Sequence, residues 1–193
     1  MRFLKTCNKE SLVIAVSGRP GSGKTTLAKS LAEALGLRYV SSGGIFRKMA
    51  EKLGVSLVDM SRIAENDFSI DKAIDEEARN EALKGGVVVD GHIAAWILKD
   101  LAHIKISVIA PLEVRVSRIA KRDSLSFEEA LRIIKKVEDS ENRRFKALYG
   151  LDLSDNTVFD LIINTSTFTP GECLNIALEA INEVLNRCAS ENL

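Results

Sequence analysis

The chain contains few of the residues that mark specialised classes of protein. Its 193 residues include three cysteines, three prolines and two histidines, and aromatic residues make up 5%. The cysteines, Cys7, Cys173 and Cys188, are far apart and form no CxxC pair. We therefore expect reduced thiols, no structural zinc and a cytoplasmic location.

Long apolar runs are also missing. No run approaches the roughly 20 residues that a membrane-spanning helix needs. The polar start MRFLKTCNKE leads into only five apolar positions, Leu12 to Val16, which is too few for the core of a signal peptide. We expect neither a membrane partner nor a secretory signal.

Net charge is zero, since 27 Lys and Arg residues balance 27 Asp and Glu residues. This balance argues against a general nucleic-acid or anionic-membrane binder. The charges are nevertheless unevenly distributed along the chain. Residues 1–50 carry 9 basic and 2 acidic side chains, and residues 114–147 carry 10 basic and 6 acidic side chains. The two basic blocks could meet around a polyanion, or could pair with the acidic blocks across solvated faces.

What is present is an alternation of short apolar runs with longer helical patterns, in a chain that is 46% hydrophobic and 28% charged. The runs that predict strands are 11–18, 38–41, 85–91, 105–110 and 160–166. The patterns that predict helices are 23–35, 43–53, 57–65, 70–84, 111 onward, 126–148 and 170–188. Apolar strands that alternate with helices predict one α/β domain with a five-stranded, doubly wound parallel sheet. The helices at 43–84 and 111–148 exceed what crossovers need, which indicates subdomains that close over the sheet edge.

One motif follows the first predicted strand and precedes the first helix. It fits G-x-x-x-x-G-K-[ST] and consists of Gly18, Arg19, Pro20, Gly21, Ser22, Gly23, Lys24 and Thr25. Glycines let successive backbone N–H groups face a phosphate, and the helix N-terminus adds partial positive charge. We expect Lys24 to reach the β- and γ-phosphates of ATP and Thr25, helped by Thr26, to bind Mg²⁺. The expected architecture is a three-layer α/β/α P-loop NTPase fold.

A second feature is Asp90, which ends the apolar run Val87–Val89. A carboxylate at this place is suited to hold Mg²⁺ or its waters. A capping Asp in a turn would give the same pattern.

Basic residues recur on one predicted helix, where Arg115, Arg118 and Arg122 fall at i, i+3 and i+7. Arginines stabilise the charge that spreads over a phosphoryl group in transfer. We expect Arg118 and Arg122 to be catalytic, with a solvated face neutralised by nearby glutamates as the alternative.

Longer segments resemble cytidylate kinases, particularly the short archaeal type, over about residues 12–182. They are GRPGSGKT, Ser41 to Arg47, VVVDGHIAAW, RVSRIAKRD and EDSENRRFKALYGLDLSDNTVFDLIINTS. The resemblance implies ATP-dependent phosphorylation of CMP and dCMP with Mg²⁺ by a monomer. It also implies an acceptor-binding subdomain at about 42–84 and a lid at about 115–148.

The resemblance further assigns acceptor-site residues. Ser42 and Arg47 match the element that grips the acceptor nucleotide, with Arg47 on its phosphate. Glu141 and Arg144 match the residues that read the cytosine edge. The alternatives are a surface salt bridge for Arg47 and an ordinary i,i+3 helix pair for Glu141 and Arg144.

Three positions depart from the family pattern. Gly44 stands where many members have an acidic residue, and His92 and Val137 stand where arginines are common. His92 could still donate to a phosphate, as a pH-dependent partner. Val137 makes no such contact, although Lys135 or Lys136 could substitute. Asp71 and Asp75 are expected to be exposed helix charges.

Two other functions stay open on the sequence. One is an adenylate kinase or another small-molecule kinase on the same fold. The other is a nucleotide-dependent switch or binding protein, although no Asn-Lys-x-Asp guanine-reading element is present.

Overall fold

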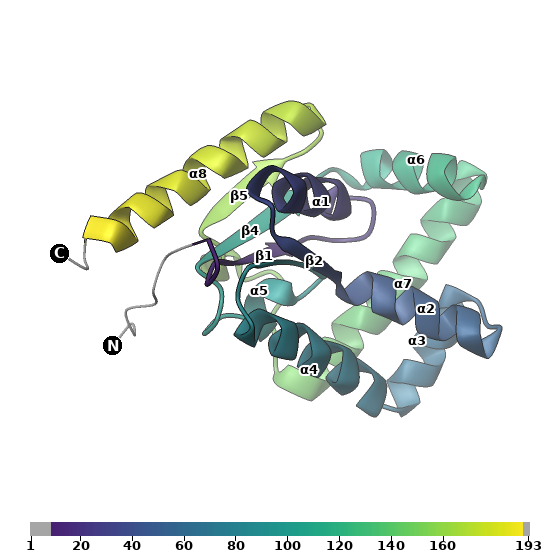
Figure 1. Ribbon diagram of the computed structural model, residues 1–193. Helices are drawn as coiled ribbons and strands as arrows, with labels where there is room; N and C mark the ends of the chain where they lie inside the picture. Colours follow the sequence, from purple (N-terminus) through teal and green to yellow (C-terminus); the bar gives the residue numbers. More distant parts are fainter. Residues whose placement is uncertain (1–8, 191–193) are drawn as a thin grey trace.

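A five-stranded parallel sheet forms the centre of the molecule, which confirms the predicted fold class (Figure 1). The computed structural model describes the backbone of residues 9–190 and the side chains of residues 9–187. The strands, in the order β2-β3-β1-β4-β5, are β1 Val13–Ser17, β2 Arg38–Ser41, β3 Val87–Asp90, β4 Ile104–Ile109 and β5 Leu161–Asn164. All neighbouring strands are parallel, so their carboxyl ends meet at one edge of the sheet.

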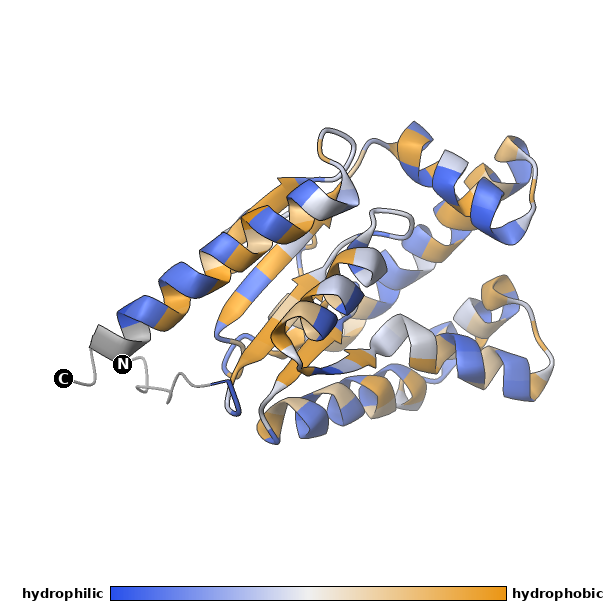
Figure 2. Cartoon of the chain, turned by 45° about the horizontal axis from the view of Figure 1, so that its top comes forward, coloured by the Kyte–Doolittle hydropathy of each residue, from blue (hydrophilic) through white to orange (hydrophobic). Residues whose placement is uncertain are grey.

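Both faces of the sheet are covered by helices. Along β1, Ile14 and Val16 pack toward α1 (Lys24–Leu35) and α8 (Pro170–Ser190), while Val13 and Ala15 pack toward α4 (Ser69–Leu83) and α5 (Ala94–Ile97). This is the period of two that a strand imposes on its side chains. Figure 2 shows the result, with strands coloured hydrophobic along most of their length. Burial on both faces explains why β1 and β3 are apolar runs. The edge strand β2 is less buried and carries the exposed Arg38.

The predicted helices are present with boundaries set by local caps. The remaining helices are α2 Ser42–Leu53, α3 Leu57–Asn66, α6 Leu112–Asp123 and α7 Phe127–Tyr149. Gly36 and Gly150 end α1 and α7 at φ 60° and 65°, in the left-handed region that glycine adopts at no steric cost. Ser126 and Glu129 form a reciprocal capping box at the start of α7, which fixes where that helix begins.

Helices α2, α3, α6 and α7 extend beyond the carboxyl ends of the strands, and α4 runs from there back along one face of the sheet (Figure 1). Helices α2, α3 and α4 share a cluster of buried apolar side chains that includes Ala50, Met60 and Ile74. Helices α6 and α7 share another, around Val116 and Ile134. Each group therefore has a small core of its own, separate from the two cores beside the sheet.

The structure also departs from the sequence predictions. Helix α5 and the 3-10 turn η1 (Asn156–Val158) were not predicted, because elements of three or four residues show no periodicity. Pro111 is the N-cap residue before α6 rather than a residue of its first turn.

Cys173 is a buried free thiol, whereas Cys7 and the side chain of Cys188 lie outside the described residues. No helix within the described part of the chain is long and apolar enough to cross a membrane.

Candidate active site

A cavity of about 880 Å³ opens at the carboxyl ends of the strands, between the loop after β1 and the two groups of helices. Most of the site residues predicted from the sequence line it: Pro20, Gly21, Gly23, Lys24, Thr25, Thr26, Ser42, Arg47, His92, Arg118, Arg122, Glu141 and Arg144. Gly18, Arg19, Ser22 and Asp90 are not among its lining residues. The cavity thus brings together predicted residues from five segments of the chain.

The loop after β1 requires glycine at positions where it touches its neighbours. Gly18 has φ 157°, and a Cβ added there would lie 2.5 Å from the carbonyl oxygen of Val108. Gly21 has φ 79°, and its added Cβ would lie 2.6 Å from the carbonyl oxygen of Arg115. The N-cap of α1 is Gly23, which makes no side-chain capping hydrogen bond. The first N–H groups of α1 are therefore suited to bind an anion.

Asp90 lies at the end of β3, beside the start of α1. Its Oδ2 accepts hydrogen bonds from Thr25 Oγ1 at 2.7 Å and from the hydroxyl of Tyr39 at 2.9 Å. Its Oδ1 is buried and has no hydrogen-bond partner among the described residues. A buried carboxylate oxygen without a donor, beside a threonine hydroxyl, provides the hard oxygen ligands that Mg²⁺ or its bound waters prefer.

The ionisation of this end of the cavity follows from burial and nearby charge. Burial lowers the pKa of the Lys24 ammonium, and the carboxylates of Asp90 and Glu141 oppose that change. Burial raises the pKa of Tyr39 to about 12, so its hydroxyl keeps its proton and donates to Asp90. Sequence reasoning missed Tyr39, because one tyrosine in a short strand carries no pattern.

Arg118 is held against the phosphate-binding loop by a residue that sequence reasoning missed. Its Nη1 donates to Thr165 Oγ1 at 2.8 Å and its Nη2 donates to the carbonyl oxygen of Thr165 at 2.7 Å. Thr165 follows β5, and its hydroxyl donates to the carbonyl oxygen of Ser22 at 2.7 Å. Arg122 lines the cavity and is paired with Asp123 at 2.7 Å. The structure therefore places both predicted catalytic arginines on the cavity wall.

Arg115 does not share that wall, which corrects the interpretation of the three arginines as one face. It is 6% exposed, pairs with Glu138 of α7, and donates to the carbonyl oxygen of Pro20 at 3.0 Å. Glu138 is 8% exposed and also accepts from Arg19 at 3.3 Å. Glu138 is one of the nearby glutamates of the alternative interpretation, and it is buried rather than part of a solvated face. Arg115 and Glu138 instead connect α6 and α7 to the backbone of the loop.

Glu141 and Arg144 do not pair with each other as neighbours on a helix can. Glu141 Oε2 lies 2.7 Å from His92 Nδ1. Burial alone would raise the pKa of Glu141, but His92, Lys24 and Arg144 outweigh burial and hold it below its usual range. An ionised Glu141 is an acceptor only.

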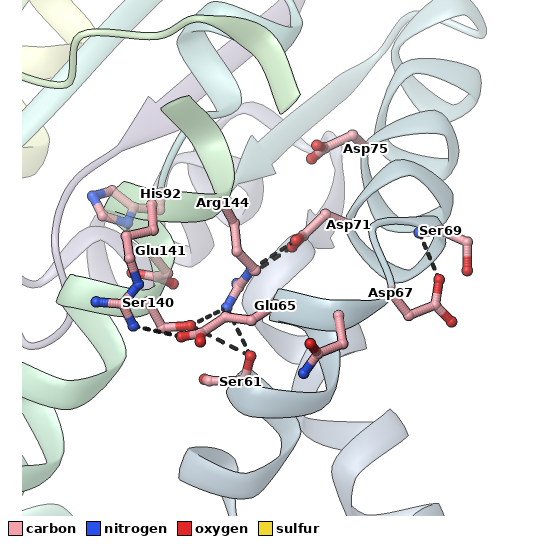
Figure 3. Close-up of polar contacts among 12 residues, drawn as sticks. Ser61, Glu65, Asp67, Ser69, Asp71, Asp75, His92, Ser140, Glu141 and Arg144 are labelled. Carbon is pink, nitrogen blue, oxygen red and sulfur yellow. Dashed lines mark hydrogen bonds and ion pairs between the residues drawn. The ribbon is translucent and has the colours of Figure 1, made fainter. Parts of the chain in front are cut away.

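Asp71 and Asp75 are buried or half-buried, so the expectation that they are exposed helix charges is wrong (Figure 3). Asp71 is 5% exposed and forms an ion pair with Arg144, with 2.7 Å between Asp71 Oδ2 and Arg144 Nε. Asp75 accepts a hydrogen bond from the hydroxyl of Tyr149 at 2.7 Å. The partners lie more than 70 residues away along the chain, so no local pattern pointed to them.

The remaining predicted positions lie around the cavity rim. Ser42 is the first residue of α2, and Arg47 is exposed on the same helix without an ion-pair partner among the described residues. The N–H of Gly44 donates to Ser41 Oγ at 3.1 Å and so completes the cap of α2. Val137 lines the cavity with an apolar side chain. The lysines suggested as its substitutes, Lys135 and Lys136, are exposed and are not lining residues.

A phosphate-binding loop between a parallel sheet and α1, with helical groups on either side of one cavity, defines a kinase of the P-loop class. The family model of the cytidylate kinase-like family matches residues 13–167. The chain belongs to this family.

Curated relatives named cytidylate kinase align with this chain along nearly their whole length. The chain is 46% identical over 175 residues to the cytidylate kinase of Sulfurisphaera tokodaii, and the alignment covers 90% of this chain and 97% of that protein. It is 47% identical over 174 residues to the cytidylate kinase of Staphylothermus marinus, covering 90% and 98%. Among solved structures, a gluconokinase from Sinorhizobium meliloti matches with a TM-score of 0.62 at 15% identity, over 96% of this chain and 100% of that one. A shikimate kinase from Acinetobacter baumannii matches with a TM-score of 0.55 at 17% identity, covering 92% and 96%. The two structures share the fold.

Proposed function

We propose that this protein transfers the γ-phosphoryl group of ATP to CMP or dCMP, giving ADP and CDP or dCDP. The proposal rests on one observation: the same cavity is lined by the phosphate-binding loop and by Glu141 and Arg144. The relatives named cytidylate kinase support the same acceptor.

Glu141 and Arg144 determine which base the acceptor site prefers. Glu141 Oε2 is occupied by His92, which leaves Oε1 to accept from an exocyclic amino group. Arg144 donates to the ring acceptor beside that group. Cytosine presents an amino donor next to a ring acceptor, whereas uracil presents an oxygen at the position of the amino group. A carboxylate facing that oxygen would be repelled, so CMP is preferred to UMP.

Lys24, Thr25 and Arg118 act on the donor triphosphate. Lys24 reaches its terminal phosphates and Arg118, fixed by Thr165, stabilises the charge that develops on the group in transfer. Thr25 and Asp90 would hold Mg²⁺ or its waters, for which the free Oδ1 of Asp90 is suited. When bound there, the metal ion would supply positive charge that offsets the charge of the triphosphate.

The acceptor phosphate is bound by Ser42 and Arg47, with His92 as a further donor. Arg122 assists Arg118 in stabilising the group in transfer. A monophosphate has a second pKa near 6, so it is mostly dianionic at neutral pH. It attacks without a general base, and positioning does most of the work. The helical groups at about 42–84 and 115–148 act as acceptor-binding subdomain and lid, and they exclude water when they close.

The proposal also covers domain organisation, oligomeric state, location and binding partners. We propose that residues 1–193 form one kinase domain that acts as a monomer in the cytoplasm. Its partners are then small nucleotides, without a role for nucleic acid.

A coupled assay of ADP release tests the proposal, with ATP and Mg²⁺ plus CMP, dCMP, UMP, AMP or GMP in turn. The expected result is the fastest release with CMP or dCMP. Fastest release with AMP would identify an adenylate kinase and overturn the acceptor assignment. ATP binding without stimulation by any monophosphate would favour a nucleotide-dependent switch.

A further inference from the structure

The guanidinium of Arg144 is held by Asp71, Ser140 and Ser61 (Figure 3). It is 3% exposed. Its centre lies 5.6 Å from the ring centroid of Phe46 and 5.7 Å from that of Phe145. Two aromatic rings therefore restrain the side chain in addition to its hydrogen bonds.

Those hydrogen bonds use nearly all of its donors. Nε donates to Asp71 Oδ2 at 2.7 Å and Nη2 donates to Asp71 Oδ1 at 3.3 Å. Nη1 donates to Ser140 Oγ at 2.7 Å and to the carbonyl oxygen of Ser61 at 3.5 Å. A guanidinium has five N–H donors, so one N–H, on Nη2, is left over by the hydrogen bonds of the described residues.

We propose that Asp71 is a positioning residue that determines base specificity, because its carboxylate limits Arg144 to a single outward donor beside Glu141. The inference rests on the proposed function and deepens it. Asp71 comes from α4 and Arg144 from α7, so the pair also fixes α7 against the acceptor-binding helices.

One donor beside one acceptor is a pattern that distinguishes bases. It complements the ring acceptor and the amino group of cytosine. Uracil carries an N–H at the position of that ring acceptor, so a donor fixed there favours cytosine. An Arg144 released from Asp71 would no longer hold its donor at that place, and this preference for cytosine would be lost. Loss of the Asp71 carboxylate should therefore lower kcat/KM for CMP much more than kcat/KM for UMP.

The test compares Asp71→Asn with the wild-type enzyme in kcat/KM for CMP and for UMP. The substitution keeps the shape of the side chain but removes its charge and one acceptor. We expect kcat/KM for CMP to fall by about 100-fold and that for UMP by less than about tenfold, so the CMP-to-UMP ratio falls by about tenfold or more. Asp67→Asn is the matched control, since Asp67 is exposed near the start of the same helix and should leave both values unchanged.

A second variant keeps the test decisive if Asp71→Asn does not fold. Ser140→Ala removes the 2.7 Å acceptor of Nη1 and should lower the same ratio by a smaller factor. The dissociation constant for ATP should stay unchanged in both variants.

Equal loss of activity toward CMP and UMP would assign Asp71 a structural role and overturn the inference alone. Wild-type enzyme that phosphorylates neither pyrimidine nucleotide would overturn the proposed function and this inference together.

Discussion

The buried ion pair between Arg115 and Glu138 offers the sharpest test of how the phosphate-binding loop is held. Their side chains are 7% and 11% exposed. Glu138→Ala would leave the guanidinium of Arg115 buried without its carboxylate. Removing one partner of a buried pair lowers the free energy of unfolding by about 3–5 kcal/mol. We expect a loss of about 3 kcal/mol, because Arg115 still donates hydrogen bonds to the carbonyl oxygens of Ala110 and Pro20.

Urea denaturation followed by circular dichroism measures this change. In a chain of this length the loss corresponds to a fall in Tm of roughly 6–12 °C. Arg62→Ala is the control, because it breaks an ion pair with Asp59 in which both side chains are exposed. It should cost less than about 1 kcal/mol.

A double variant separates stability from nucleotide binding. Arg115→Met with Glu138→Leu replaces the pair by apolar side chains, which restores most of the stability. Pro20 still loses the donor to its carbonyl oxygen, so the loop is less restrained and the dissociation constant for ATP, from calorimetry, should stay about tenfold above that of the wild type. A stable Glu138→Ala variant, or a double variant that binds ATP as tightly as the wild type, would refute this reasoning.

Three further predictions follow from single contacts. Lys24→Ala should lower the rate of phosphoryl transfer by at least about 100-fold while the circular dichroism spectrum stays that of the folded protein; an unchanged rate would remove Lys24 from the mechanism. Thr165→Val removes one of the two oxygens of Thr165 that orient Arg118, and the carbonyl oxygen remains. It should lower kcat by about tenfold with little change in KM for the nucleoside monophosphate, whereas an unchanged kcat would show that Arg118 does not need the hydroxyl. Burial raises the pKa of Asp75 to about 6, against the opposing hydrogen bond from Tyr149. Its contribution to stability is therefore present below pH 4 and is lost as the pH rises through 6. Asp75→Asn should reduce the difference in unfolding free energy between pH 4 and pH 7 by about 2 kcal/mol, and identical pH profiles for variant and wild type would contradict the assignment.

The elements that sequence analysis predicted are those whose signal is local. The loop from Gly18 to Thr25 has fixed spacing, and Gly18 and Gly21 are needed because neighbouring backbone leaves no room for a Cβ. Strands β1 and β3 are buried along their whole length and nearly all apolar, because helices cover both faces of the sheet there. Gly36 and Gly150 mark helix ends by their own conformation.

The contacts that were missed depend on residues distant in the chain. Asp71 and Arg144 are 73 residues apart, and only packing of α4 beside α7 makes the aspartate a buried partner. Spacing placed Arg115 on one helix face with Arg118, but Arg115 sits where α6 touches the loop. Thr165 lies in a segment that had been recognised, yet nothing local shows that it bonds to both Arg118 and the loop.

The most direct measurement is a crystal structure with CMP, Mg²⁺ and a non-hydrolysable ATP analogue bound together. The account predicts the triphosphate on the loop 18–25, its terminal phosphate in line with the phosphate of CMP, and the cytosine edge between Glu141 and Arg144. CMP bound elsewhere, or a terminal phosphate directed away from the acceptor wall, would contradict it.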